Sequence, residues 1–129
     1  MESHYKPAGQ STVSPYLIVD GADGTIGFLT RVFGAVAGLR KADASGRVKH
    51  AEVLIGDTVV MIADALPPAW PSVPSHVHIY VPDVDATYHA AIGAGASSVQ
   101  EPVKRQDENR RAGVRDAGGT TWWIATKVD

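Results

Sequence analysis

The chain is 129 residues long, the size of one domain, and its net charge of −2 gives no electrostatic reason to expect a nucleic-acid partner. It contains no cysteine, which excludes disulfides, thiolate metal sites and a thiol nucleophile. No apolar run approaches the length that crosses a membrane, and residues 1–6 lack the apolar core of a signal peptide, so we expect a cytoplasmic protein without membrane contact. Residues 1–12 are polar, and we expect them to form a loose tail.

The first half of the chain predicts one helix and four strands. The helix is expected over Ala22–Phe33, where apolar residues recur at helical spacing, and Gly34 follows it as a typical helix end. The last two strands form a hairpin across the turn at Gly56-Asp57. The expected strands are Ser14–Val19, Val36–Lys41, Val48–Ile55 and Thr58–Ala63.

The second half predicts the same order of elements after a linker. Residues 64–75 hold four prolines around Trp70, and no regular element fits there. A helix is expected over Val84–Ala94, with Asp83 at its N-cap and Gly95 just past its end. A charged loop is expected over Arg105–Arg111. The expected strands are His76–Val81, Ser97–Lys104, Ala112–Arg115 and Thr120–Thr126.

The two halves of the chain align with each other without a gap. Gly56 aligns with Gly118, an offset of 62 residues, and the same offset brings six further identical residues into register. Each half is therefore one βαβββ unit that is too small to close a core alone, and we expect any functional site to lie between the copies. The other identical pairs are Val19 with Val81, Asp23 with Asp85, Thr25 with Thr87, Thr58 with Thr120, Ile62 with Ile124 and Ala63 with Ala125.

Four short motifs accompany this repeat: His50-Ala51-Glu52, Gly56-Asp57, Asp83-Val84-Asp85-Ala86 and Asp116 to Trp122. Together with the tandem βαβββ units, they resemble the vicinal oxygen chelate superfamily (glyoxalase I, fosfomycin- and bleomycin-resistance proteins, extradiol dioxygenases) and most of all its PhnB-like branch.

The resemblance covers about residues 13–127 and implies a single α+β domain with a particular layout. Module one would span 13–63, a proline-rich linker 64–75 and module two 76–127, with half-barrel sheets around a concave cleft. Since members commonly form dimers and single half-barrels leave open sheet edges, we also expect a homodimer.

In that superfamily, metal ligands come from the start of the first strand and the middle of the last strand of each copy. Carried over by the 62-residue offset, those positions hold Ser14 and Met61 in the first copy, and His76 and Trp123 in the second. Only His76 is an ordinary metal ligand, whereas a divalent ion needs two or three imidazole or carboxylate groups. We therefore expect no cofactor and no metal centre of the family type.

Alternation of side chains along the strands predicts which residues line the cleft. Pairing across the Gly56-Asp57 turn sets Glu52 opposite Met61, a cleft position, whereas Trp122 is expected to pack under a helix. Gly113 is interpreted as strand punctuation. The expected ligand-binding residues are Tyr16, His50, Glu52, Met61, His76, His78, Tyr80, Trp123 and, from the charged loop, Arg111.

Two functions stay open. One is a small-molecule binding protein of the bleomycin-resistance type, favoured by the lost ligand positions and the aromatic floor of the cleft. The other is a glyoxalase-type lyase, isomerase or related enzyme. It would use Glu52 or His76 as a metal-free general base, or a metal site rebuilt from His76 with His50, Glu52 or His78. A structural interpretation also remains, in which these polar residues pair with one another or lie at a dimer seam.

Overall fold

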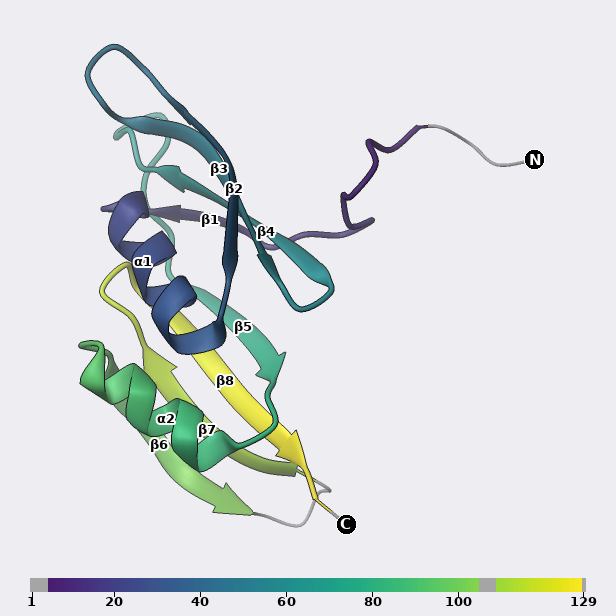
Figure 1. Ribbon diagram of the computed structural model, residues 1–129. Helices are drawn as coiled ribbons and strands as arrows, with labels where there is room; N and C mark the ends of the chain where they lie inside the picture. The colour runs from purple at the N-terminus through teal and green to yellow at the C-terminus, as the bar shows by residue number, and fades with distance from the viewer. Residues whose placement is uncertain (1–4, 105–108, 129) are drawn as a thin grey trace.

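Each half of the chain forms a four-stranded sheet with one helix, as the sequence predicts (Figure 1). The computed structural model describes residues 5–104 and 109–128. The strand orders are β1-β4-β3-β2 and β5-β8-β7-β6, and in each sheet the first and last strands of the copy pair in parallel. The elements are β1 (Tyr16–Val19), α1 (Ala22–Phe33), β2 (Val36–Ala42), β3 (Val48–Ile55), β4 (Thr58–Asp64), β5 (Ser75–Tyr80), α2 (Val84–Gly93), β6 (Ser97–Lys104), β7 (Asn109–Arg115) and β8 (Thr120–Lys127).

The observed boundaries follow the expected ones closely, except at the start of β7. This strand begins at Asn109, so Arg110 and Arg111 belong to a strand and the expected charged loop is wrong at those positions. The Arg110 guanidinium is held by two hydrogen bonds of 2.8 and 2.9 Å to the Asp85 carboxylate on α2. The error arises because charged side chains interrupt the alternation of apolar and polar residues by which a strand is recognised in a sequence. Residues 105–108 lie outside the described residues.

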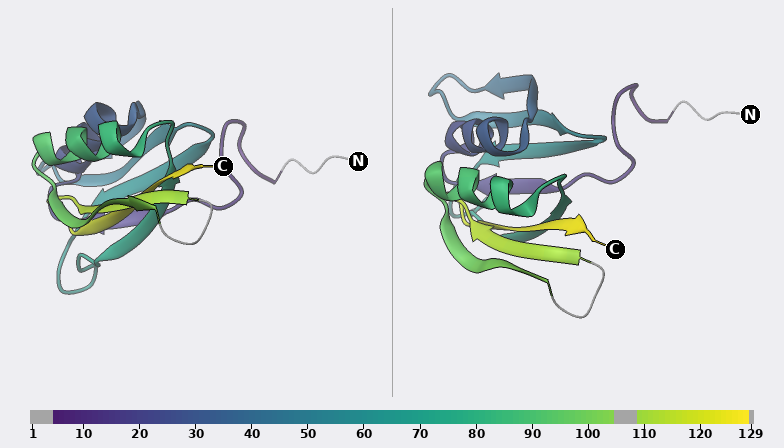
Figure 2. Two further views of the ribbon diagram at one scale, coloured as in Figure 1. Left: turned by 90° about the horizontal axis from the view of Figure 1, so that it is seen from below. Right: turned by 60° about the horizontal axis from the view of Figure 1, so that its bottom comes forward.

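Both helices cover the same side of the two sheets (Figure 2), and the residues facing them form one core that is shared between the copies. At the seam between the copies, Phe33 at the end of α1 packs on Trp122 of β8, with ring centroids 5.1 Å apart. Neither copy therefore closes its core alone, as the repeat predicts. Among the described residues, no helix is long and apolar enough to span a membrane.

The two helices begin with different caps. In α2 the Asp83 carboxylate accepts a hydrogen bond from the backbone N–H of Ala86, as the sequence predicts. α1 has no such side-chain cap, and its first turn is instead held by Asp64 at the end of β4. One carboxylate oxygen of Asp64 accepts from Ala22 N–H at 2.6 Å and the other from Val48 N–H at 2.8 Å. This single side chain fixes α1 against both strands of the first hairpin.

The N-terminal tail is tied to the first sheet, in contrast to the expected loose segment. The Ser11 hydroxyl accepts a hydrogen bond of 2.9 Å from the backbone N–H of Val59, and the Gln10 amide donates to Glu52 at 2.8 Å. These bonds join residues far apart in sequence, so local composition could not reveal them.

The neighbouring tryptophans of β8 lie on opposite faces, as alternation predicts. Trp122 is 1% exposed and lies in the core, where its indole N–H donates to the buried carboxylate of Asp116 at 2.9 Å. Trp123 is half-buried and points to the other face, in register with His78 of β5 and Gly113 of β7.

We predict that Trp122→Ala lowers the free energy of unfolding by about 3–5 kcal/mol, because it leaves a large cavity in the shared core. Trp123→Ala is expected to cost clearly less, since its ring has fewer packed neighbours. Urea denaturation of both variants measures the difference. If the Trp123 variant were the less stable of the two, the assignment of faces would be inverted.

Candidate functional site

We call the side of the sheets that faces away from the helices the open face. Strand register sets Tyr16 beside Met61 and Glu52 opposite Met61 in the first sheet, and His78 beside Trp123 in the second. The open face carries all the side chains expected to bind a ligand, namely Tyr16, His50, Glu52, Met61, His76, His78, Tyr80, Trp123 and Arg111. The contacts found among the described residues group most of them into one cluster on each sheet.

The cluster on the first sheet is centred on Glu52. Its carboxylate accepts from the Gln10 amide at 2.8 Å and bonds the His50 ring nitrogen Nε2 at 2.9 Å, while His50 makes an edge contact with Tyr16. The Gln10 hydrogen bond, followed by that of His50, holds the pKa of Glu52 below its usual value. A carboxylate stabilised in this way is a weak base, which argues against Glu52 as the general base that the sequence suggested.

The cluster on the second sheet contains a flat surface made by Trp123 and His76. The indole N–H of Trp123 donates to Nδ1 of His76 at 3.0 Å, and the two ring planes differ by 8° with centroids 6.2 Å apart. Because an indole N–H and an imidazole lone pair both lie in their ring planes, this bond sets the rings edge to edge. We call this pair the aromatic platform.

Gly113 makes room for the platform. A Cβ atom at this position would lie 2.7 Å from the six-membered ring of Trp123, so only glycine lets the indole lie over β7. The sequence interpretation of Gly113 as strand punctuation missed this role. The cross-strand pairing of Gly113 with Trp123 was the signal that could have found it.

The polar neighbours of the platform are His78, Tyr80 and Arg111. The rings of His78 and Tyr80 meet at 4.9 Å, and Asn109 donates a long hydrogen bond of 3.4 Å to the Tyr80 hydroxyl. Burial, and then the positive charge of Arg111, lower the pKa of His78. His78 is thus a neutral polar group at neutral pH, and Arg111 is the cation of this cluster.

The residues at the family's metal positions do not fit a divalent ion. His76 has its Nδ1 lone pair engaged by Trp123, and neither Met61 nor the indole of Trp123 is an oxygen or imidazole donor. Within residues 5–104 and 109–128, no three His, Asp or Glu side chains come together as a metal-binding group. The alternative donors come from both sheets, His50 and Glu52 from the first and His76 and His78 from the second, and among the described residues no three of them come together.

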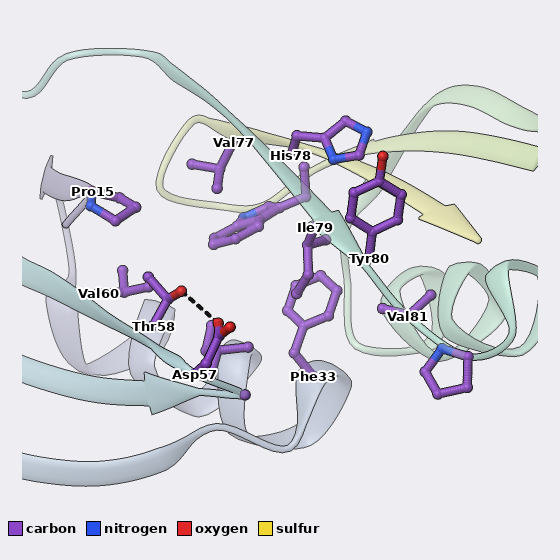
Figure 3. Close-up of a pocket in the computed structure, with 14 residues that line it drawn as sticks. Pro15, Phe33, Asp57, Thr58, Val60, Val77, His78, Ile79, Tyr80 and Val81 are labelled. Atoms are coloured by element: carbon purple, nitrogen blue, oxygen red, sulfur yellow. Dashed lines mark hydrogen bonds between the residues drawn. The ribbon is translucent and has the colours of Figure 1, made fainter. Parts of the chain in front are cut away.

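A separate cavity of about 670 Å³ lies at the seam between the copies (Figure 3). Val77, Ile79 and Phe33 point into this seam cavity, whereas the rings of His78 and Tyr80 lie on the other side of β5. Sequence analysis did not predict it, because it looked only at the strand faces turned away from the helices. The lining residues are Pro15, Phe33, Ile55, Gly56, Asp57, Thr58, Val60, Val77, His78, Ile79, Tyr80, Val81, Pro82 and Trp122.

Comparison with known protein families identifies the superfamily of this chain. Residues 9–124 match the model of the Glyoxalase/Bleomycin resistance protein/Dioxygenase superfamily. The chain therefore belongs to this superfamily, as the tandem βαβββ units and their motifs predict.

Individual relatives and solved structures are similar to the chain over most of its length. An uncharacterised protein from Mycobacterium bovis is 30% identical, with 92% of this chain and 85% of the relative covered. The crystal structure of TioX from Micromonospora sp. ML1 is 28% identical with a TM-score of 0.75, covering 92% of this chain and 99% of TioX. The PhnB protein from Bacillus cereus shares the fold at 13% identity, with a TM-score of 0.73 and coverage of 90% and 99%.

Proposed function

We propose that this protein binds a small molecule on the open face without the metal centre of its superfamily. The aromatic platform is the observation that carries the proposal. It offers a flat apolar surface with exposed His76 at its edge, and a hydrogen bond holds both rings in place before a ligand arrives. Preorganised rings of this kind suit stacking with a planar ligand.

The charges near the platform favour an anionic group on that ligand. Arg111 lies two residues before Gly113 on the same face of β7, so a positive charge lies on the strand that runs beneath Trp123. On the first sheet, the negative charge of Glu52 is held between Gln10 and His50 and would repel an anion. We therefore infer a planar aromatic carboxylate or a similar anion, bound at the second sheet.

A homodimer is part of the proposal. Tyr16 and Tyr80 are 45% and 65% exposed on the open face, so a partner chain that covers them would bury aromatic surface. The two open-face clusters also lie on different sheets of the chain. A second copy that packs on the open face would cover the exposed rings of both sheets.

We predict that light scattering at micromolar concentration returns twice the chain mass of 13.6 kDa. The physical reason is the burial of Tyr16 and Tyr80 between chains, so replacing both with Ser is expected to weaken the dimer. A monomer mass for the unmodified protein at that concentration would contradict the dimer.

One observation keeps an enzymatic function as a second candidate. The contact of 2.9 Å between Nε2 of His50 and Glu52 resembles the carboxylate-held imidazole that general-base catalysis uses. In that case His50 would take the proton and Glu52 would orient it, rather than Glu52 or His76 acting as the base. A glyoxalase-type proton abstraction from a small molecule is the reaction class that this pair would serve.

A titration with 2-naphthoate tests the proposed function. We predict binding to the unmodified protein and a loss of at least about tenfold in affinity for both Trp123→Ala and His76→Ala, because each removes one half of the platform. Trp70→Ala is the matched control, since Trp70 is 46% exposed and belongs to the linker, where it pairs with Leu66. Mass spectrometry is expected to recover the naphthoate unchanged.

Equal affinity losses in the Trp70 and Trp123 variants would contradict the platform as the binding surface. As a check on the second candidate, superfamily substrates can be incubated with the protein and with His50→Ala. Turnover that disappears in this variant would favour the enzyme.

A further inference from the structure

The shared core is incompletely closed at one place, and that place is the seam cavity. Several apolar side chains that pack against the core stay partly exposed, and most of them come from the end of α1, the β3–β4 turn and the length of β5. Those that also line the cavity are Phe33, Ile55, Val77, Ile79 and Val81. Apolar surface left uncovered in a concave place is a common property of ligand sites.

The size and the walls of the seam cavity suit a small apolar molecule. Its volume of about 670 Å³ lies within the usual range of small-molecule sites, roughly 300–1,000 Å³. At its base, Phe33 packs on Trp122, whose only polar group is already bonded to Asp116. The base therefore offers hydrocarbon and ring surface, with no unsatisfied indole N–H to hold water.

The charge at the rim of the cavity is negative. Asp57 is the carboxylate among the lining residues, which include neither lysine nor arginine. The hydroxyl of Thr58 donates to one oxygen of Asp57 at 2.8 Å, and Figure 3 shows these two side chains facing each other beside Val60. This bond leaves the second carboxylate oxygen as an acceptor for a cation at the rim.

We propose that the seam cavity is a second small-molecule site, which takes an apolar amine. The hydrocarbon part lies between Phe33, Val60 and Ile79, and the protonated nitrogen pairs with Asp57 at the rim. This site uses the side of β5 opposite to the aromatic platform, so it does not depend on the function proposed for the open face.

Three probes of equal chain length separate the apolar and the charged contribution: octylamine, octanol and octanoate. Each is titrated into the full chain while the indole N–H resonance of Trp122 is followed by NMR. We expect saturable shifts, with octylamine binding about three- to fivefold tighter than octanol, the range of an exposed ion pair, and octanoate binding weakest.

Two variants probe the two parts of the site. Asp57→Asn is expected to reduce octylamine binding to the level of octanol and to leave octanol unaffected. Val77→Phe fills the cavity from an edge strand and is expected to weaken all three probes at least about tenfold. Matched controls are Glu101→Gln and Leu39→Phe, exposed positions on β6 and β2, which should change nothing.

Several outcomes would overturn the proposal. One is the absence of any shift of the Trp122 resonance at millimolar octylamine. A second is equal binding of all three probes with no effect of Asp57→Asn. A third is loss of octylamine binding in Trp123→Ala, which would assign the amine to the open face. A fourth is a Val77→Phe variant that alters the oligomeric mass but not octylamine binding, which would make the cavity a contact between copies.

Discussion

The packing of Phe33 on Trp122 joins the two copies of the repeat and sets the position of β8, on which the open-face site depends. Phe33 ends the helix of the first copy, and Trp122 lies in the last strand of the second, so this contact closes a core that neither copy completes. Asp116 fixes the indole from within, because its carboxylate accepts from Trp122 and from the backbone N–H of Thr120. These contacts fix the orientation of β8 with Trp122 toward the core. Because side chains alternate along a strand, Trp123 is then directed to the open face.

That orientation explains the chemistry proposed for the open face. Trp123 lies over Gly113 and donates to Nδ1 of His76, so the neutral imidazole carries its proton on Nε2 and presents no free lone pair to a metal ion. The same residues that do not fit a metal therefore build a flat, preorganised surface. The chain has the fold of its superfamily, and a pair of hydrogen-bonded rings lies at the positions that match the family's ligands in the second copy.

Alternation along strands and the internal repeat predict much of this architecture, because both follow from local geometry. They separate Trp122 from Trp123 correctly and place the open-face residues on one side of the sheets. The bond from Gln10 to Glu52 joins distant segments, which a single sequence does not encode locally, whereas the fit of Gly113 under an indole follows from the pairing of β7 with β8. The seam cavity was not predicted because it lies on the strand faces turned toward the helices, which the prediction of cleft residues did not include.

The most direct test of the account is the metal content of protein purified without a histidine tag. With the Nδ1 lone pair of His76 engaged by Trp123, elemental analysis is predicted to find far less than one divalent ion per chain, even after incubation with Zn²⁺ or Mn²⁺ and desalting. About one tightly held ion per chain that is lost on His76→Ala would contradict the account, since it would restore the metal centre that the platform is proposed to replace.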